Sequence, residues 1–313
     1  MKPDVLAVFN LGDHVTEQLA RHFTVHRLWT AKDPDAMLRE LAPRIQAVFM
    51  TNMHGATAAF MDKLPNLKII SAFGAGYERI DIEAAKARGI MVTNVQATNC
   101  GCVADSAIGL LIAAQRQIVA ADRFVRSGGW LRQRLYDTTS RVYGRRMGII
   151  GLGAIGREIA RRAEAFDIEI GYHNRRRRDD VPYHFESSVL KLAEWADDLV
   201  AACPLNSETR GLVNRDVLKA LGPEGVFVNI ARGGVADEKA LIEALQNRTI
   251  RAAGLDVYEN EPDIDPAFFT LENAVLTPHC AGITIDSALD SAEVVIANLK
   301  AFFAGRPPIT RVA

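Results

Sequence analysis

The stretch Arg146-Met147-Gly148-Ile149-Ile150-Gly151-Leu152-Gly153-Ala154-Ile155-Gly156 joins two hydrophobic periodicities. The residues up to Ile150 form a short apolar run that is typical of a buried parallel strand. Beyond Gly156, the residues Ile159, Ala160 and Ala163 recur at helical spacing, with charged side chains between them. The sequence therefore predicts a strand, a glycine turn and a helix in immediate succession.

The three glycines Gly151, Gly153 and Gly156 have the spacing of a dinucleotide-binding turn. The first permits a tight turn, the second lets the backbone approach a pyrophosphate, and the third lets the helix pack on its strand. The N-terminus of the helix then points at the phosphates. A purely structural glycine turn is the alternative, but a second apolar run, Ile168 to Tyr172, follows the helix as in a nucleotide-binding unit. We interpret the stretch as a dinucleotide site.

Asn174 stands just after this second run, at about the 20-residue distance where an acidic residue usually binds the adenosine ribose. Four arginines, Arg175 to Arg178, follow it. The missing carboxylate would no longer repel a 2′-phosphate, and guanidinium groups can bind one. We predict NADPH as the cofactor, with Asn174, Arg175 and Arg176 at the adenosine end. Arg177 and Arg178 are interpreted as a solvated loop.

The totals exclude several classes of protein. A length of 313 residues suggests two domains, and a net charge of −1 argues against a nucleic-acid or membrane-surface partner. The N-terminus lacks the pattern of a signal peptide, and the longest apolar segment, Ala107 to Ala114, is too short to cross a bilayer. We expect a cytoplasmic protein. The cysteines are predicted to be free thiols without a metal site, because none forms a CxxC pair: Cys100, Cys102, Cys203 and Cys280.

Strand-like and helical runs alternate along most of the chain, which predicts parallel sheets covered by helices on both faces. The fold class is α/β, with a doubly wound Rossmann cofactor domain inserted into a doubly wound, flavodoxin-like substrate domain. We assign residues 1–98 plus 284–313 to the substrate domain and 99–283 to the cofactor domain.

Two further segments lie in the middle of the chain. The stretch from Cys102 to about Arg126 is predicted to be one long helix, ended by Gly128 and Gly129. The segment from Trp130 to Tyr143 has no regular period and mixes aromatic side chains with arginines. We interpret it as a contact surface, either between subunits or within its own domain.

Arg232, Glu261 and His279 each follow a different expected strand in the second half of the chain. Parallel strands bring their carboxyl ends to one edge of a sheet, where ligands bind. A carbonyl that accepts a hydride needs a proton donor that titrates near neutral pH, and histidine is the natural candidate. A carboxylate would orient its ring and favour the charged form, while an arginine fork could hold a substrate carboxylate. Taken singly, each residue could be an ordinary ion pair, turn or capping residue, but together they predict a catalytic site.

Four ordered motifs are similar to those of the D-isomer-specific 2-hydroxyacid dehydrogenases, and more narrowly to the glyoxylate/hydroxypyruvate reductase branch. They are GLGAIG at 151–156, NIARG at 229–233, GLDVYENEP at 254–262 and LTPH at 276–279. The resemblance covers nearly the whole chain. It implies reduction of small 2-oxo acids by NADPH, with His279 as acid/base, Glu261 as its partner and Arg232 as carbonyl and carboxylate binder.

The resemblance also implies where the ligands bind. The loop Phe73-Gly74-Ala75-Gly76-Tyr77 would bind the substrate carboxylate through the N–H groups of Ala75 and Gly76, and glycines after a strand can form such an anion nest. Met53 and the region from Trp130 to Tyr136 are expected to shape the substrate pocket. Asp256 would bind the nicotinamide carboxamide. The complete expected cofactor lining is Gly151, Gly153, Ala154, Ile155, Gly156, Asn174, Arg175, Arg176, Cys203, Pro204, Ile230, Ala231, Asp256, His279, Ala281 and Gly282.

Alternatives to this reading stay open. An NAD-linked oxidiser of another D-2-hydroxy acid would share most of the motifs. A corepressor-like protein that senses nucleotide would keep the fold without turnover, although the intact Arg232, Glu261 and His279 argue against it. Glyoxylate, hydroxypyruvate, hydroxyphenylpyruvate and 2-ketogluconate are all candidate substrates. A homodimer is expected from the family likeness alone.

Overall fold

The computed structural model describes residues 2–51, 54–96, 98–133 and 136–313. They form two compact units, which we call the small unit, Met1–Asn99 with Ile283–Ala313, and the large unit, Cys100–Gly282. These bounds fall one residue from the expected 1–98 plus 284–313 and 99–283. The roles of the two units stay predictions.

The small unit is built on a five-stranded parallel sheet with the order β2-β1-β3-β4-β5. This is the strand order of flavodoxin-like folds. Its strands are β1 (Asp4–Ala7), β2 (Thr24–Arg27), β3 (Ala47–Thr51), β4 (Ile69–Phe73) and β5 (Met91–Thr93).

The large unit is built on a seven-stranded parallel sheet with the order β12-β11-β10-β9-β6-β7-β8. Counted from β6, this is the 3-2-1-4-5-6 order of Rossmann folds with one more strand at the far edge. The predicted α/β class with two doubly wound sheets is confirmed. The strands are β6 (Arg146–Ile150), β7 (Glu169–His173), β8 (His184–Phe185), β9 (Asp198–Ala201), β10 (Val226–Asn229), β11 (Ala252–Leu255) and β12 (Ala274–Leu276).

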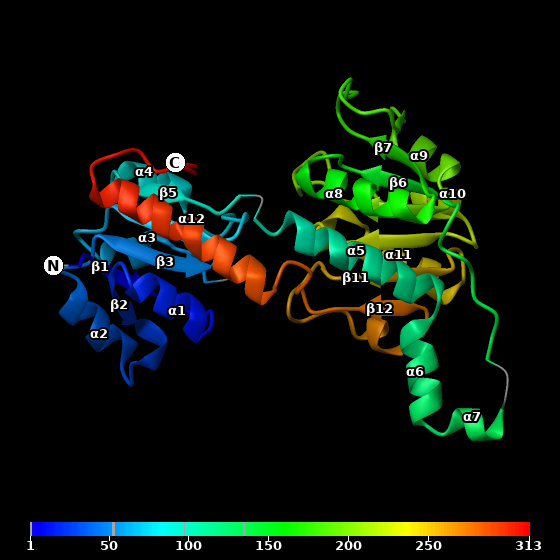
Figure 1. Ribbon diagram of the computed structural model, residues 1–313, viewed down its shortest axis with the longest axis horizontal. Coiled ribbons are helices and arrows are strands. Elements are labelled where there is room, and N and C mark those ends of the chain that lie inside the picture. Colours follow the sequence, from blue (N-terminus) through cyan, green and yellow to red (C-terminus); the bar gives the residue numbers. More distant parts are fainter. Residues whose placement is uncertain (1, 52–53, 97, 134–135) are drawn as a thin grey trace. The chain divides into compact units, whose positions relative to one another are not determined.

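Helices cover both faces of each sheet (Figure 1). In the small unit, α1 and α12 pack on one face and α2, α3 and α4 on the other. In the large unit, α5 and α8 oppose α9, α10 and α11. The α-helices are α1 (Asp13–Ala20), α2 (Pro34–Leu41), α3 (Ala58–Asp62), α4 (Ile82–Ala87), α5 (Cys100–Gln115), α6 (Ile118–Arg126), α7 (Gly129–Arg132), α8 (Ala154–Ala163), α9 (Val189–Trp195), α10 (Arg215–Leu221), α11 (Glu238–Gln246) and α12 (Ile285–Phe303).

The strands are apolar throughout because both faces of each sheet are buried. Successive side chains point to opposite faces, so Leu6 joins the core under α2 to α4 while its neighbours Val5 and Ala7 join the core under α1 and α12. In β10 of the large unit, Phe227 likewise faces one way, and Val226 and Val228 face the other. Continuous apolar runs in the sequence therefore fix buried parallel strands.

The expected long helix from Cys102 to Arg126 is wrong in one respect. It is broken into α5 and α6, which are bent by 61°. The break lies at Gln117, whose φ of 51° is left-handed and cannot continue an α-helix. The sequence does not signal this break, since position 117 is neither a glycine nor a proline.

Among the described residues, no single helix is both long and apolar enough to cross a membrane, and only the bent pair α5 and α6 reaches the required length and composition together.

Candidate active site

The glycine turn joins β6 to α8 in the large unit. Gly151 has a φ of 97°, and a Cβ atom there would lie 2.8 Å from the backbone of Cys203. A Cβ atom on Gly156 would lie 2.3 Å from the carbonyl oxygen of Gly151. Both positions therefore require glycine for the turn and for helix packing. Around Gly153, by contrast, no described atom outside the adjoining chain lies within 4 Å of a Cβ position, so this side of the turn is open.

Gly153 is also the N-cap of α8, and no side chain caps the helix there. The first N–H groups of a helix have no partner within it and carry a partial positive charge. The open side of the turn and the uncapped helix start together fit a pyrophosphate. Gly153, Ala154 and Ile155 as phosphate contacts stay predictions.

Asn174 follows β7 and is tied to the glycine turn. Its Oδ1 atom accepts a hydrogen bond of 2.8 Å from the N–H of Leu152. Arg175 is 85% exposed and lies 3.8 Å from Glu208, while Arg176 is exposed. The hydrogen bond from Leu152 holds the Asn174 side chain at the glycine turn. Because this side chain is an amide and not a carboxylate, it would not repel the 2′-phosphate of NADP.

Arg177 and Arg178 differ from each other. Arg177 is exposed and bonds to no other part of the described chain, as a solvated loop residue would. Arg178 instead pairs with Asp180, which also pairs with Arg157. These two guanidinium groups lower the pKa of the Asp180 carboxyl to about 2. Arg178 is therefore engaged by its own loop.

Arg232 lies directly after β10, and the surrounding backbone explains its place. Asn229 accepts from the N–H of Ala231 and donates to the carbonyl of Arg232, which closes a tight turn. At Gly233, a Cβ atom would lie 1.8 Å from the carbonyl carbon of Tyr258. Position 233 thus requires glycine for close packing against the loop after β11, and Arg232 beside it is near enough for its charge to act on Glu261.

Glu261 and His279 form the central pair of the site. Glu261 Oε2 lies 2.6 Å from Nδ1 of His279, and Glu261 Oε1 accepts from the N–H of Tyr258 at 2.9 Å. Burial of Glu261 raises its pKa, but the hydrogen bonds from His279 and Tyr258 and the charge of Arg232 outweigh it, so the pKa is lowered overall. Nδ1 of His279 is engaged by this carboxylate, and the side chain is 48% exposed. The ring therefore has Nε2 available for a proton.

The backbone of His279 is left-handed, with a φ of 53°. Asp256 organises this turn: its carboxylate, 1% exposed, accepts from the hydroxyl of Thr277 and from the N–H groups of Cys280 and Ala281. Its backbone carbonyl accepts from the N–H of His279 at 2.8 Å. Left-handed non-glycine residues concentrate at functional sites, where the surroundings hold them in place. The structure gives Asp256 this supporting role, and its predicted contact with a carboxamide is untested.

The other expected lining residues also follow strand ends of the large sheet. Cys203 and Pro204 follow β9, Ile230 and Ala231 follow β10, and Ala281 lies in the turn after β12. These residues are buried except for Pro204, which is exposed, and Gly282, which follows Ala281 in the same turn, is half-buried. Burial raises the pKa of the Cys203 thiol to about 11, which favours the neutral thiol.

The predicted substrate loop belongs to the small unit and follows β4. Gly74 has a φ of 119°, and the Ala75 carbonyl accepts a hydrogen bond of 2.8 Å from Asn94. Among the described residues, the N–H groups of Ala75 and Gly76 have no hydrogen-bond acceptor, as an anion-binding loop requires. Met53 lies outside the described residues. Its neighbour His54, held by Thr51 at 2.9 Å, is exposed close to the end of β3.

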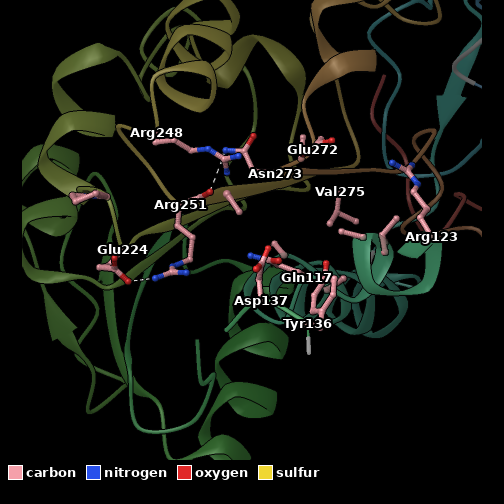
Figure 2. A pocket seen from close by; sticks show the side chains of 17 residues that line it. Gln117, Arg123, Tyr136, Asp137, Glu224, Arg248, Arg251, Glu272, Asn273 and Val275 are labelled. Atoms are coloured by element: carbon pink, nitrogen blue, oxygen red, sulfur yellow. Dashed lines mark hydrogen bonds and ion pairs between the residues drawn. The ribbon is translucent and has the colours of Figure 1, made fainter. Parts of the chain in front are cut away.

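The cavity of about 330 Å³ in Figure 2 lies elsewhere. Pro223 and Glu224 on its wall precede β10, Arg248 and Arg251 precede β11, and Asn273 precedes β12. The cavity is therefore at the amino edge of the large sheet, whereas the glycine turn, Arg232 and His279 are at the carboxyl edge. Because ligands of open parallel sheets bind at the carboxyl ends of the strands, we place the active site there in spite of the cavity.

The chain is similar to known proteins in sequence and fold. Residues 108–281 match the family described as D-isomer specific 2-hydroxyacid dehydrogenase, NAD binding domain. Over 308 residues, with 98% of each chain covered, the sequence is 40% identical to a hydroxyphenylpyruvate reductase from Plectranthus scutellarioides. It is also 41% identical to a glyoxylate/hydroxypyruvate reductase from Arabidopsis thaliana, again over 308 residues and 98% of each chain. This chain belongs to the D-isomer specific 2-hydroxyacid dehydrogenase family.

A solved structure of the same family supports the fold and the class of cofactor. The NADPH-dependent glyoxylate/hydroxypyruvate reductase from Sinorhizobium meliloti, in complex with NADP and malonate, aligns with a TM-score of 0.87 at 36% identity, covering 100% of this chain and 97% of that one. The predictions of the family and of an oxidoreductase are confirmed, and the matched segment of this 2-hydroxyacid dehydrogenase is an NAD-binding domain.

Sequence reasoning missed the residues that hold this dehydrogenase site in place. Thr277 was quoted only as part of a motif, and Tyr258, whose hydroxyl donates to the carbonyls of Leu255 and Thr277, received no role. Gly233 and Asn94 were likewise not assigned. The available signal was position, since each lies within four residues of a strand end; Tyr258, Thr277 and Gly233 also stand within two residues of a predicted site residue, whereas Asn94 does not.

Proposed function

We propose that this dehydrogenase reduces small 2-oxo acids, glyoxylate and hydroxypyruvate first, to 2-hydroxy acids with NADPH. The observation that carries the proposal is the 2.6 Å contact between Glu261 and His279 at the edge of the sheet that holds the glycine turn. When bound, the reduced nicotinamide supplies a hydride to the carbonyl carbon.

His279 delivers the proton. Glu261 holds Nδ1, which leaves Nε2 as the atom that protonates the developing alkoxide. The carboxylate also fixes the orientation of the ring for this transfer. Arg232 binds the substrate carboxylate and polarises the carbonyl through its planar fork. The Ala75 and Gly76 N–H groups of the small unit are further ligands for that carboxylate.

The adenosine end distinguishes NADPH from NADH. Asn174 offers an amide where a carboxylate would repel the 2′-phosphate, and the exposed Arg175 and Arg176 follow it. The small unit then acts as the substrate domain and the large unit as the cofactor domain.

The decisive experiment compares initial rates for a panel of 2-oxo acids with NADPH and with NADH. Glyoxylate, hydroxypyruvate, hydroxyphenylpyruvate and 2-ketogluconate form the panel. We expect NADPH-dependent reduction, fastest with one of the first two. A preference for NADH would reject the role given to Asn174 and the arginines, and no turnover of any 2-oxo acid would reject the function.

We further propose a cytoplasmic homodimer. All four cysteines are free thiols, as suits a reducing compartment.

The helices α6 and α7 expose apolar side chains, with Trp130 at 61% and Leu131 at 92% exposure, which favours a protein contact. Light scattering of the wild type and of Leu131→Asp tests this: the wild type should have the mass of two chains and the variant should dissociate, and a monomeric wild type would exclude the dimer.

A further inference from the structure

Asn94 connects the predicted substrate loop to the C-terminal end of the chain. It follows β5, the edge strand next to β4, and is 2% exposed. Its Nδ2 atom donates to the Ala75 carbonyl at 2.8 Å, and the neighbouring Val95 N–H donates to the Gly74 carbonyl at 2.9 Å. The loop after β4 is therefore held through its carbonyl groups.

A peptide bond in its trans form directs its C=O and N–H groups to opposite sides. When Asn94 binds the Ala75 carbonyl, the N–H of Gly76 in the same peptide unit points away from Asn94. The hydrogen bond at one side of the loop thus sets the direction of the donor at the other. A free rotation of this peptide unit would turn the donor away from an anion.

Asn94 is itself held by the C-terminal tail. The Asn94 N–H donates to the Thr310 carbonyl at 3.2 Å, and the Thr310 hydroxyl donates to the Asn94 carbonyl at 2.5 Å. Further along, Val312 and Ala313 pair with Val92 of β5, so the tail covers the edge of this sheet. Unpaired strand edges are commonly protected in this way.

The tail is fixed in turn by Asn298 of α12, which is fully buried. Asn298 Nδ2 donates to the Thr310 hydroxyl at 2.8 Å, and its Oδ1 accepts from the N–H groups of Ile309 and Thr310. We call Asn94, Asn298 and Thr310 the clasp. A continuous set of hydrogen bonds therefore runs from α12 through the clasp to Ala75, all within the small unit.

The side-chain amide of Asn94 has an unfavourable contribution to the free energy of folding. Its Oδ1 atom is buried and has no hydrogen-bond partner among the described residues. Burying an unpaired acceptor is unfavourable, so an apolar residue would be favoured here if the position served packing alone. The donor to Ala75 is what only a side chain such as asparagine supplies.

We propose that Asn94 is a positioning residue for substrate binding, held by the clasp, and that it aims the Gly76 N–H at the substrate carboxylate. This inference rests on the proposed function, because it requires the loop to bind a 2-oxo acid. The clasp acts on binding of the carboxylate and leaves hydride transfer and the cofactor site unaffected.

Steady-state kinetics test the inference. For Asn94→Ala, we expect the KM for glyoxylate to rise about tenfold, as the loss of one hydrogen bond implies, with kcat changed less than threefold and NADPH affinity unchanged. Thr310→Val should raise KM in the same direction, and Thr310→Ser, which keeps the hydroxyl, should restore it. If the variants lose melting temperature and kcat while KM stays at the wild-type value, Asn94 is merely structural and the inference is wrong.

Amide exchange separates this inference from the proposed function. In Asn94→Ala and Thr310→Val, but not in Thr310→Ser, the amides of Ile80 and Val95, which bond to Tyr77 and Gly74, should exchange faster than in the wild type. Unchanged exchange would overturn the clasp, whatever the enzyme reduces. A wild type that reduces no 2-oxo acid would instead reject the proposed function, and with it the substrate role, while faster exchange would still establish the clasp.

Discussion

The carboxyl edge and the amino edge of the large sheet differ in how their residues are packed and paired. At the carboxyl edge, Gly151, Gly233 and His279 occupy backbone positions that are tightly packed or left-handed, and a buried carboxylate holds the turn around the histidine. At the amino edge, the cavity of Figure 2 is lined by exposed charged side chains such as Arg248 and Glu272. Left-handed backbone alone does not separate the two edges, because Gln117 and Arg248 on the cavity wall are left-handed as well. What sets the carboxyl edge apart is the contact between Glu261 and His279 beside the glycine turn.

The largest expected effect concerns the histidine. His279→Ala should lower kcat by about 10³-fold, because general acid catalysis is lost, while NADPH affinity stays within about threefold. His184 offers a matched control, since it also contacts a glutamate, Glu186, at 2.8 Å and is comparably exposed. Turnover measurements should show His184→Ala at the wild-type rate. A near-normal kcat for His279→Ala would mean that the pair of His279 and Glu261 is no more catalytic than the pair of His184 and Glu186.

Arg232 and Arg248 compare the two edges directly. Arg232→Lys should lower kcat/KM for glyoxylate by about 100-fold, since lysine keeps the charge but loses the bidentate fork. Arg248→Lys at the cavity should leave kcat/KM within about twofold. The same steady-state assay serves both variants. Equal losses in the two would mean that the cavity takes part in the reaction.

The cofactor preference should respond to the loop after β7. Arg175→Ser combined with Arg176→Ser should reduce the ratio of kcat/KM with NADPH to that with NADH by about 30-fold, because two cations near the 2′-phosphate are lost. Arg177→Ser is the adjacent control and should leave the ratio nearly unchanged. If Arg177→Ser shifts the ratio as strongly as the double variant, the phosphate position has been assigned to the wrong arginines.

The smallest effect is on stability and depends on pH. Because the pKa of folded Glu261 is lowered, its ionised form stabilises the native state above the ordinary carboxyl pKa of about 4.3, and this stabilisation is lost as the pH falls through the folded value. Glu261→Gln should therefore melt about 3 °C below the wild type at pH 7, with a gap that closes toward pH 3.

Thermal melts across this pH range provide the check, with Glu272→Gln at the amino edge as the control. That variant should follow the wild type at every pH. A gap for Glu261→Gln that widens in acid would reverse the sign of the linkage and contradict the lowered pKa.

The fold was largely predictable because its signals are local. Apolar runs such as Val226 to Val228 predict buried parallel strands, and caps such as Asn214 and Asp237 mark where α10 and α11 begin. The break at Gln117 was not predictable, since glutamine rarely adopts the left-handed conformation and neither glycine nor proline stands at this position.

The candidate site was predictable only in part. Strand ends located Arg232, Glu261 and His279, and the structure brings Glu261 and His279 into contact. The supporting contacts were not accessible, because they join residues far apart in sequence, as Asn94 joins Ala75 and Thr310. Hydrogen-bond partners at such separations depend on the register of strands, which periodicity does not determine.

The left-handed backbone of His279 has a practical consequence. Asparagine adopts this conformation more readily than most residues, so His279→Asn should preserve the turn around Asp256 while removing the proton donor. Such a protein would hold cofactor and oxo acid together without converting them. It would be the form of choice for crystallising a trapped ternary complex, in which each ligand could be located directly.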